Sequence, residues 1–238
     1  FVFIDAKYEE NIVDQNKINI QFFLNELEKS YVDKINIFGN FITEEKVIRN
    51  ALIIDEGDAY NKILFDKSIN NVKSSGIFKN VGSKITNSKN NNKVINITVE
   101  EMPTGEIFAG VGTGTAGSSF SAGLKEKNYL GKGITLDTNF ALSENELRGK
   151  FSVLNPNFRN SDRSLNTTIE STVSDFMTDS GYKTTRTGLS FGTGFEQFNN
   201  VYINFDVSNY YEKLVTSDIA TDIKKKQEGD YFENLFLY

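Results

Sequence analysis

The pattern of apolar and polar positions changes at Met102-Pro103. Before this point, short apolar segments alternate with two amphipathic patterns of helical period. After it, apolar residues occupy every second position in segments about ten residues long, which is typical of transmembrane β-barrel strands. The alternation arises because lipid-facing and lumen-facing side chains must take turns along each strand. The pattern therefore predicts a small α+β module followed by a sheet of membrane type.

The first residues predict a hairpin. Strands are expected at residues 1–8 and 17–24, with a polar turn around residues 11–16, and Ile18, Ile20 and Phe22 share one face of the second strand. A lone hairpin is marginally stable in water. We therefore expect residues 1–29 to be the C-terminal strands of a preceding module whose helices lie upstream.

The next segment predicts a complete module in the order β-α-α-β-β. The first strand, at residues 31–37, is followed by a Gly39-Asn40 turn and by a helix that carries Val47, Ile48, Ala51 and Leu52, with Thr43 as its N-cap. The second helix is expected from about Asn61 to a C-terminal cap at Gly76, followed by strands at residues 78–86 and 93–101.

The alternating region begins with a glycine-rich strand at residues 105–115. Ile107, Ala109 and Val111 share one face, while Phe108 and a row of glycines share the other. Further strands follow, the last three at residues 185–195, at 201–207 and from about residue 231. The side chains expected to face lipid are Ile107, Val111, Phe120, Leu124, Leu136, Phe140, Phe151, Val153, Leu189, Phe191 and Phe205. A soluble sandwich alternates too, but its strands average about five or six residues, so strand length favours a barrel.

Composition excludes several functional classes. The net charge of −6 and the lack of a basic run argue against nucleic-acid binding. The chain has no His and no Cys, so His-dependent triads and thiolate chemistry are impossible within it, and we expect no enzyme, no cofactor and no metal site. The acidic cluster of Asp55, Glu56 and Asp58 lacks the ligand spacing of a calcium loop, so we interpret it as a solvated turn.

Several motifs, in a consistent order along the chain, resemble one family. They are Tyr31–Asn40, Glu45–Arg49, Ser75–Val81, Ile97–Glu101, Gly110–Gly114, Phe120–Gly123, Asn128–Gly133 and Asn155–Phe158. Together they resemble the BamA family of outer-membrane-protein assembly factors, which carry periplasmic POTRA modules before a β-barrel. The family's Arg-Gly-Phe loop motif is absent from the sequence, and we expect it, with the last barrel strand, in a missing C-terminal half.

The resemblance implies a fold and a division into domains. The fold is an α+β POTRA module followed by the N-terminal half of an antiparallel transmembrane β-barrel. Residues 1–29 then end a preceding POTRA module, residues 30–102 form the last POTRA module, and residues 103–238 form about the first seven or eight barrel strands. So few strands cannot close as the parent barrel does, so we expect a curved open sheet.

The resemblance also implies a function and a location. We expect assembly and insertion of β-barrel proteins into the bacterial outer membrane, with the POTRA modules in the periplasm. The implied partners are unfolded outer-membrane proteins, accessory periplasmic lipoproteins of the assembly complex and outer-membrane lipid. The alternatives are a POTRA-barrel secretion or translocation pore, and a soluble adhesin-like domain.

Three groups of residues are the expected sites. The first barrel strand is expected to template client strands at a lateral seam; its residues are Gly105, Ile107, Ala109, Gly110, Val111, Gly112, Thr113 and Gly114. The POTRA edge strand, with Phe78, Val81 and Ile85, is expected to receive clients or partners. The family turn motifs supply Gly39, Asn40, Asn128, Tyr129, Leu130, Gly131, Gly133, Asn155, Pro156 and Phe158. Glycines in the first strand weaken a seam that must open, or they serve barrel curvature or make room for an aromatic such as Phe120.

Overall fold

A computed structural model describes residues 4–14, 17–26, 29–88, 91–114, 117–198 and 201–237. The chain forms two compact units. The first contains Phe1–Asn40 and Ala51–Glu100, and the second contains Phe41–Asn50 and Glu101–Tyr238. Within the described ranges, no helix is long and apolar enough to cross a membrane.

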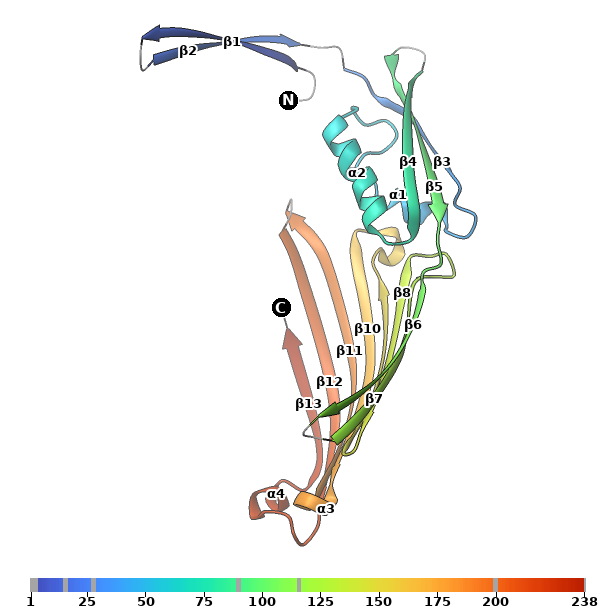
Figure 1. Cartoon of the computed structure of the whole chain (residues 1–238), viewed down its shortest axis with the longest axis vertical. Helices are drawn as coiled ribbons and strands as arrows, with labels where there is room; N and C mark the ends of the chain where they lie inside the picture. The colour runs from blue at the N-terminus through green and yellow to red at the C-terminus, as the bar shows by residue number, and fades with distance from the viewer. Residues whose placement is uncertain are drawn as a thin grey trace. The chain divides into compact units, whose positions relative to one another are not determined.

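A two-stranded antiparallel sheet begins the first unit (Figure 1). It pairs β1 (Ile4–Asp14) with β2 (Lys17–Glu26). The predicted turn at residues 11–16 is too long, because Asn11 pairs with Asn19 and Ile12 with Ile18 inside the ladder. Cross-strand pairing, including that of the two isoleucines, keeps the polar Asn11 in the strand.

The rest of the first unit is a three-stranded sheet with a helix. The strands lie in the order β3 (Val32–Phe38), β5 (Lys93–Glu101), β4 (Phe78–Asn87), and β3 runs parallel to β5. Helix α2 (Lys62–Ser74) contacts β4. Apolar side chains from both layers are buried: Val32, Ile35, Ile54, Phe65, Ile69, Val72, Ile77, Phe78, Ile95, Ile97 and Val99. The predicted β-α-α-β-β order is confirmed.

Sequence signals at both ends of α2 are confirmed. The Asn61 side-chain oxygen accepts hydrogen bonds from the backbone N–H groups of Ile63 and Leu64, at 2.8 and 3.2 Å, so Asn61 is the N-cap. Gly76 follows the C-cap with φ of +69°, the left-handed conformation that ends many helices.

The first helix of the module is shorter than predicted. Helix α1 spans Glu45–Arg49, so Ala51 and Leu52 lie beyond its end. The prediction of Thr43 as its N-cap is wrong, because Glu44 occupies that position and makes no side-chain capping bond. The Thr43 hydroxyl instead accepts a hydrogen bond from the Asn128 side chain, at 2.9 Å.

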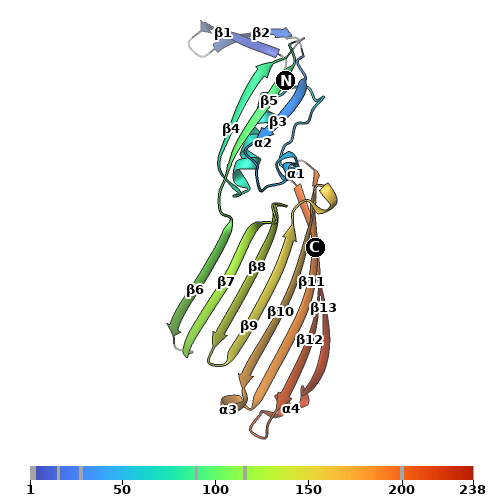
Figure 2. The same ribbon diagram turned by 90° about the vertical axis from the view of Figure 1, so that its right-hand side faces the viewer.

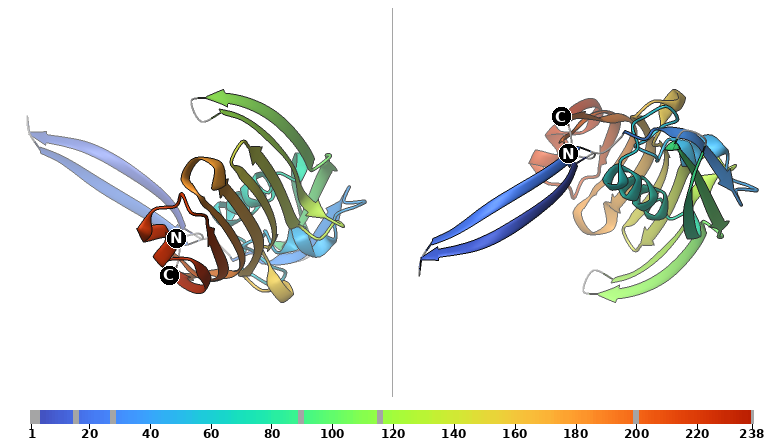
Figure 3. Two further views of the ribbon diagram at one scale, coloured as in Figure 1. Left: turned by 90° about the horizontal axis from the view of Figure 1, so that it is seen from below. Right: turned by 90° about the horizontal axis from the view of Figure 1, so that it is seen from above.

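An eight-stranded antiparallel sheet dominates the second unit, with neighbouring strands following chain order (Figure 2). Its strands are β6 (Gly105–Gly114), β7 (Gly117–Tyr129), β8 (Ile134–Ser143), β9 (Glu146–Asn155), β10 (Arg163–Phe176), β11 (Tyr182–Phe198), β12 (Val201–Thr216) and β13 (Gly229–Leu237). Short helices η2 (Phe158–Asn160), α3 (Met177–Ser180) and α4 (Asp222–Lys226) lie between strands. The sheet is curved (Figure 3), which is the predicted form.

The later strands are longer than the alternation predicts. Strand β12 continues nine residues past the predicted end at Val207, to Thr216, and β11 has 17 residues. Pairing with β11 continues without a break from Val207 to Thr216. Backbone hydrogen bonds hold this extension, so it needs no apolar alternation.

The strand register separates two faces. One row of direct partners runs Ile107, Leu124, Thr138, Phe151, Ile169, Leu189 across six strands. All eleven side chains predicted to face lipid have the parity of this row, which we call the outward face. The opposite face is polar and carries, for example, Arg186 over the Tyr210 ring, 4.0 Å from its centroid.

Candidate functional site

The predicted seam strand is an edge strand of the described sheet. Strand β6 pairs with β7 and lies at one end of the strand order. All eight predicted seam residues fall within it, whereas Thr115 lies outside the described residues. Ile107 and Val111 are 83% and 85% exposed, more than any other apolar side chain of the outward face. Among the described strands, β6 therefore has a hydrogen-bonded neighbour on one side only, and its apolar side chains are uncovered.

The glycines of β6 do not make room for an aromatic ring. A Cβ at Gly110 would lie 3.6 Å from the Ser121 hydroxyl, and one at Gly112 would lie 3.1 Å from the Ser119 hydroxyl. The interpretation that they accommodate Phe120 is wrong, because Phe120 pairs with Val111 on the outward face.

A glycine on the neighbouring strand supplies that room. The Phe108 ring lies against Gly123, its partner on β7, where a Cβ would meet the ring at 2.3 Å. Packing explains Gly123 but not Gly110, which leaves strand weakening and curvature as explanations of the β6 glycine row.

The predicted POTRA edge strand lies at the edge of its sheet. In β4, Phe78 is buried while Val81 and Ile85 are half-buried. Glu100 of β5 accepts hydrogen bonds from the side chains of Lys79 and Asn80, at 2.9 and 2.6 Å. These bonds, first from Lys79 and then from Asn80, lower the pKa of Glu100. One side of β4 is thus fixed to the sheet, and its other side has no neighbouring strand among the described residues.

The Gly39-Asn40 motif has a steric cause. Gly39 has φ of +89°, and a Cβ there would lie 2.0 Å from the Val99 carbonyl oxygen. Only glycine fits this close approach to the backbone. The motif is therefore a structural requirement of the turn after β3.

A carboxylate at the end of β5 binds three successive backbone N–H groups. Glu101 accepts hydrogen bonds from Phe41 at 3.1 Å, from Ile42 at 3.0 and 3.2 Å, and from Thr43 at 2.6 Å. Burial raises the pKa of Glu101, but the hydrogen bonds from Thr43, Ile42 and Phe41 outweigh it and hold the pKa below its usual value. Glu101 therefore fixes the loop that leads into α1.

Asn128 connects the same loop to the turn between β7 and β8. It is 8% exposed, donates to the Thr43 hydroxyl at 2.9 Å and accepts from the Gly133 N–H at 2.8 Å. The Glu44 N–H donates to the Gly131 carbonyl at 2.8 Å. Gly131 has φ of +72°, and a Cβ there would lie 2.0 Å from the Ile42 carbonyl oxygen. The motif at residues 128–133 thus forms a socket for residues 42–44.

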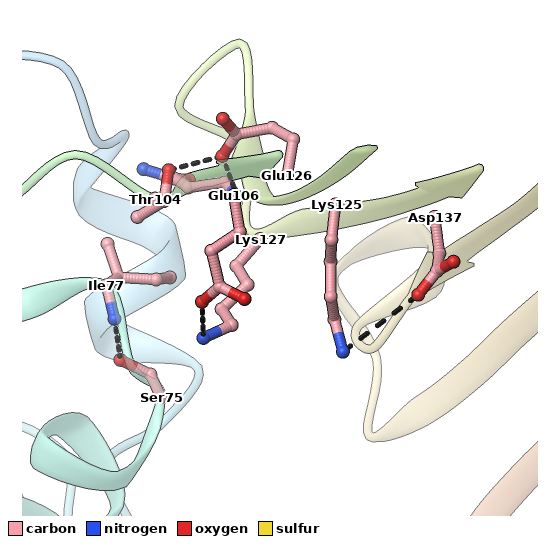
Figure 4. A network of polar contacts seen from close by, with 9 residues as sticks. Ser75, Ile77, Thr104, Glu106, Lys125, Glu126, Lys127 and Asp137 are labelled. Carbon is pink, nitrogen blue, oxygen red and sulfur yellow. Dashed lines mark hydrogen bonds and ion pairs between the residues drawn. The ribbon is translucent and has the colours of Figure 1, made fainter. Parts of the chain in front are cut away.

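Charged pairs hold the start of β6 to β7 (Figure 4). Lys127 lies 2.9 Å from Glu106, and Glu126 accepts hydrogen bonds from the Thr104 hydroxyl and, at 2.7 Å, from the Asn128 N–H. On the next strand pair, Lys125 lies 4.0 Å from Asp137. The same figure shows the turn before β4, where the Ile77 N–H donates to the Ser75 hydroxyl at 3.3 Å. These contacts fix the N-terminal end of β6. The glycine row lies toward its C-terminal end.

The second family turn also closes on itself. The Asn155 side chain accepts from the Asn157 N–H at 3.2 Å, the Asn157 side chain donates to the Ser161 carbonyl at 3.3 Å, and the Arg159 guanidinium lies 5.5 Å from the Phe158 ring centroid. Phe158 is 37% exposed. Asn155, Pro156 and Gly133 line one pocket with α1, so the structure brings the two turn motifs together. Tyr129 and Leu130 are exposed on the first turn.

The acidic cluster has structural roles that fit its interpretation as a turn. The Asp58 carboxylate accepts a hydrogen bond from the Asp55 N–H at 2.8 Å, and the Glu56 carboxylate accepts one from the Ile35 N–H at 2.9 Å. Over the described part of the chain, no group of three His, Cys, Asp or Glu residues is arranged to hold a metal ion.

Sequence reasoning missed Glu101, Glu126 and the pairing of Thr43 with Asn128. Glu101 and Thr43 are 58 positions apart, and Thr43 and Asn128 are 85 apart. The only sequence signal was the clustering of Asn128 with the glycines that follow it.

A β-α-α-β-β module followed by an antiparallel sheet with one apolar and one polar face is the fold expected of a POTRA module joined to part of an outer-membrane β-barrel. Residues 30–102 match the POTRA family model, described as a surface antigen variable number repeat. The chain is 22% identical over 235 residues to the outer membrane protein assembly factor BamA of Nitratidesulfovibrio vulgaris, covering 97% of this chain and 29% of that protein. The chain spans between 15% and 29% of the length of five curated relatives it matches.

Solved structures share the fold. BamA from Haemophilus ducreyi lacking POTRA domains 1–3 superposes with a TM-score of 0.71 at 21% identity, covering 98% of this chain and 48% of that one. CdiB from Acinetobacter baumannii superposes with a TM-score of 0.56 at 12% identity, covering 93% of this chain and 44% of that one. The predicted resemblance to the BamA family is confirmed, as is a location in the bacterial outer membrane with the POTRA module in the periplasm.

Proposed function

We propose that this chain belongs to a machine that folds and inserts β-barrel proteins into the outer membrane. In this proposal, the POTRA module receives clients or accessory subunits, and β6 templates client strands. The process is non-covalent and uses no catalytic residue. The curated relative from Nitratidesulfovibrio vulgaris is an outer membrane protein assembly factor, which supports this class of function.

The edge position of β6 is the observation that carries the proposal. An unpaired strand edge in hydrocarbon costs several kcal/mol for each unsatisfied backbone group. A client strand that adds to β6 would satisfy these groups on both strands at once, which is β-augmentation. The apolar side chains of Ile107 and Val111 point to the outward face, where a client strand would continue the apolar surface.

The sheet supplies a matched pair of positions for a crosslinking test. Ile107 and Ile169 lie in the same cross-strand row, are both exposed, and differ in that only Ile107 is on the edge strand. The chain has no Cys, so a single substitution gives a unique thiol. Ile107→Cys is expected to form disulfides with cysteines in a client strand during assembly, whereas Ile169→Cys is expected to form none.

Crosslinking of both positions to the same extent would show contact with the outward face in general and would contradict templating by β6. The measurement is the fraction of client trapped in a mixed disulfide, resolved by client position. A fixed register between Ile107 and one client position is the expected result, because strand pairing imposes register.

Receipt of partners by β4 has its own matched test. Ile85 on β4 and Ile37 on β3 are half-buried isoleucines on the two edge strands of one sheet. A photocrosslinking amino acid at position 85 is expected to capture a client or accessory subunit, and the same group at position 37 is not. Equal capture at both positions would argue against a specific role for β4.

A secretion or translocation pore is the alternative function. The fold is shared with CdiB as well as with BamA, so fold alone does not separate the two. The sequence matches favour the assembly factor. A reconstituted assay of client folding into lipid vesicles separates the functions, since an assembly factor accelerates folding and a pore does not.

A further inference from the structure

A pocket in the second unit lies where α1, the β7–β8 turn and the segment after β9 meet. Its volume is about 270 Å³. Val47, Ile134 and Pro156 give it an apolar part, and four asparagines, at positions 50, 155, 157 and 160, supply amide groups. A pocket with an apolar part and several converging polar groups is the usual form of a small-molecule site.

The charged side chains of the pocket are predominantly cationic. Lys46, Lys132 and Arg159 line it. Glu44 pairs with Lys46 at 2.6 Å, which neutralises one of these charges. Among the described residues, neither Lys132 nor Arg159 has an acidic partner within 4 Å. Lys132 interacts with Glu44 only at longer range and Arg159 lies over the Phe158 ring, so both can still bind an anion, and a guanidinium fits phosphate oxygens in a bidentate manner.

The backbone at the pocket is strained. Arg159 and Asn160 are successive residues with φ of +56° and +57°, in the left-handed region, which Asn tolerates but Arg rarely adopts. Strain of this kind concentrates at ligand sites, where the surrounding structure over-determines the backbone.

The position of the pocket on the sheet points to the kind of anion. Ile134 and Asn155 have the same parity as Leu136 and Val153, which are direct partners on the outward face. The pocket thus lies at the strand ends that border the outward apolar surface. Lysine and arginine at such a border place their charges at the level of lipid headgroups.

We propose that this pocket binds the phosphate of an anionic phospholipid headgroup at the periplasmic edge of the membrane. Lys132 and Arg159 contact the phosphate oxygens, and the asparagine amides bind the polar part of the headgroup. The first carbons of the lipid lie toward Val47, Ile134 and Pro156. The inference does not rest on the assembly function, because lipid binding is measured on the protein alone.

The test uses the intact protein in neutral detergent with dihexanoyl-phosphatidylglycerol as the probe, counted by native mass spectrometry. The double variant Lys132→Gln/Arg159→Gln is expected to raise the dissociation constant about thirtyfold, because each of the two basic residues near a headgroup adds to binding. The control Lys150→Gln/Lys226→Gln also removes two charges, but neither residue lines the pocket, and it is expected to leave binding unchanged.

Three outcomes would overturn the proposal. An equal loss in the control variant would show that net charge, and not the pocket, attracts the lipid. Displacement of the lipid by inorganic phosphate at equal concentration, with both ligands weakened by the pocket variant, would identify a site for free phosphate. Lys132→Arg keeps the charge and is expected to retain binding; loss of binding in this folded variant would also contradict the proposal.

Discussion

At the scale of single residues, the contacts with the largest expected effects are buried polar ones that join distant parts of the chain. Asn128 is such a residue, because both ends of its amide are bonded inside the second unit, to Thr43 and to Gly133. A buried donor or acceptor that loses its partner costs more than an average hydrogen bond contributes.

Replacing Asn128 with alanine is expected to destabilise the second unit by about 1–3 kcal/mol, because the buried Gly133 N–H loses its acceptor. Urea unfolding in detergent micelles measures the change. Asn139→Ala, on the polar face of β8, is the control and is expected to stay within about 0.5 kcal/mol of the parent. Equal effects of the two substitutions would contradict a special role for Asn128.

Glu101 is expected to make stability depend on pH. Its pKa is lowered in the folded chain, so its contribution is present above the pKa of the unfolded state and is lost as the pH falls through the folded pKa. Glu101→Gln should therefore be less stable than the parent at pH 7, and the difference should shrink below about pH 4. Urea midpoints at several pH values give the comparison.

The matched control for Glu101 is Glu10→Gln, which removes an exposed carboxylate from the β1–β2 hairpin. It is expected to leave the urea midpoint of the second unit unchanged at each pH. A protonated Glu101 should no longer hold the loop as a charged acceptor. A difference in urea midpoint between Glu101→Gln and the parent that stays constant from pH 7 to pH 3 would therefore contradict this role of Glu101.

At the scale of elements, β6 offers a test of whether its glycines serve an opening seam. A Cβ at Gly110 meets only the Ser121 hydroxyl at 3.6 Å, and one at Gly149 of β9 meets nothing within 4 Å, so both accept alanine. Each substitution should stabilise its strand by about 0.5–1 kcal/mol. Gly110→Ala is expected to slow client folding in vesicles, whereas Gly149→Ala is not.

If both alanine variants fold clients at the parental rate, the β6 glycines serve curvature and not opening. If both slow the reaction equally, general stiffness of the sheet is responsible. The two variants add the same methyl group within a strand. Slower client folding in Gly110→Ala alone would therefore support a seam that opens at β6.

The order and type of the elements were predictable from local pattern, but their ends were not. Asn61 and Gly76 mark α2 correctly because capping is a local interaction. The prediction that Thr43 caps α1 was wrong because the Thr43 hydroxyl bonds to Asn128, 85 residues away, and this contact outcompetes local capping. Strand β12 was cut short at Val207 because its extension is held by backbone pairing, which leaves no apolar alternation.

At the scale of the whole molecule, the candidate sites were predictable only as far as they follow from strand order. Alternation and sequential hairpins place β6 at a sheet edge, so the seam residues were found together. The socket around Asn128 was not predicted as a site, since the sequence gives no sign that residues 42–44 contact residues 128–133. Only the folded chain shows that the turn motifs at residues 128–133 and 155–158 line one pocket.

The division of the chain into two units makes a final prediction about residues 41–50. These residues lie within the POTRA sequence but belong to the same compact unit as the eight-stranded sheet. Amides in one cooperative unit exchange with solvent at related free energies.

Ile69→Ala removes a buried side chain from the first unit and should destabilise it by about 2–5 kcal/mol. Hydrogen exchange at the Ile95 amide is then expected to accelerate, while exchange at Glu44, whose N–H is bonded to Gly131, stays unchanged. Asn128→Ala should produce the reverse, and a parallel acceleration of both amides in either variant would show that the two units unfold as one.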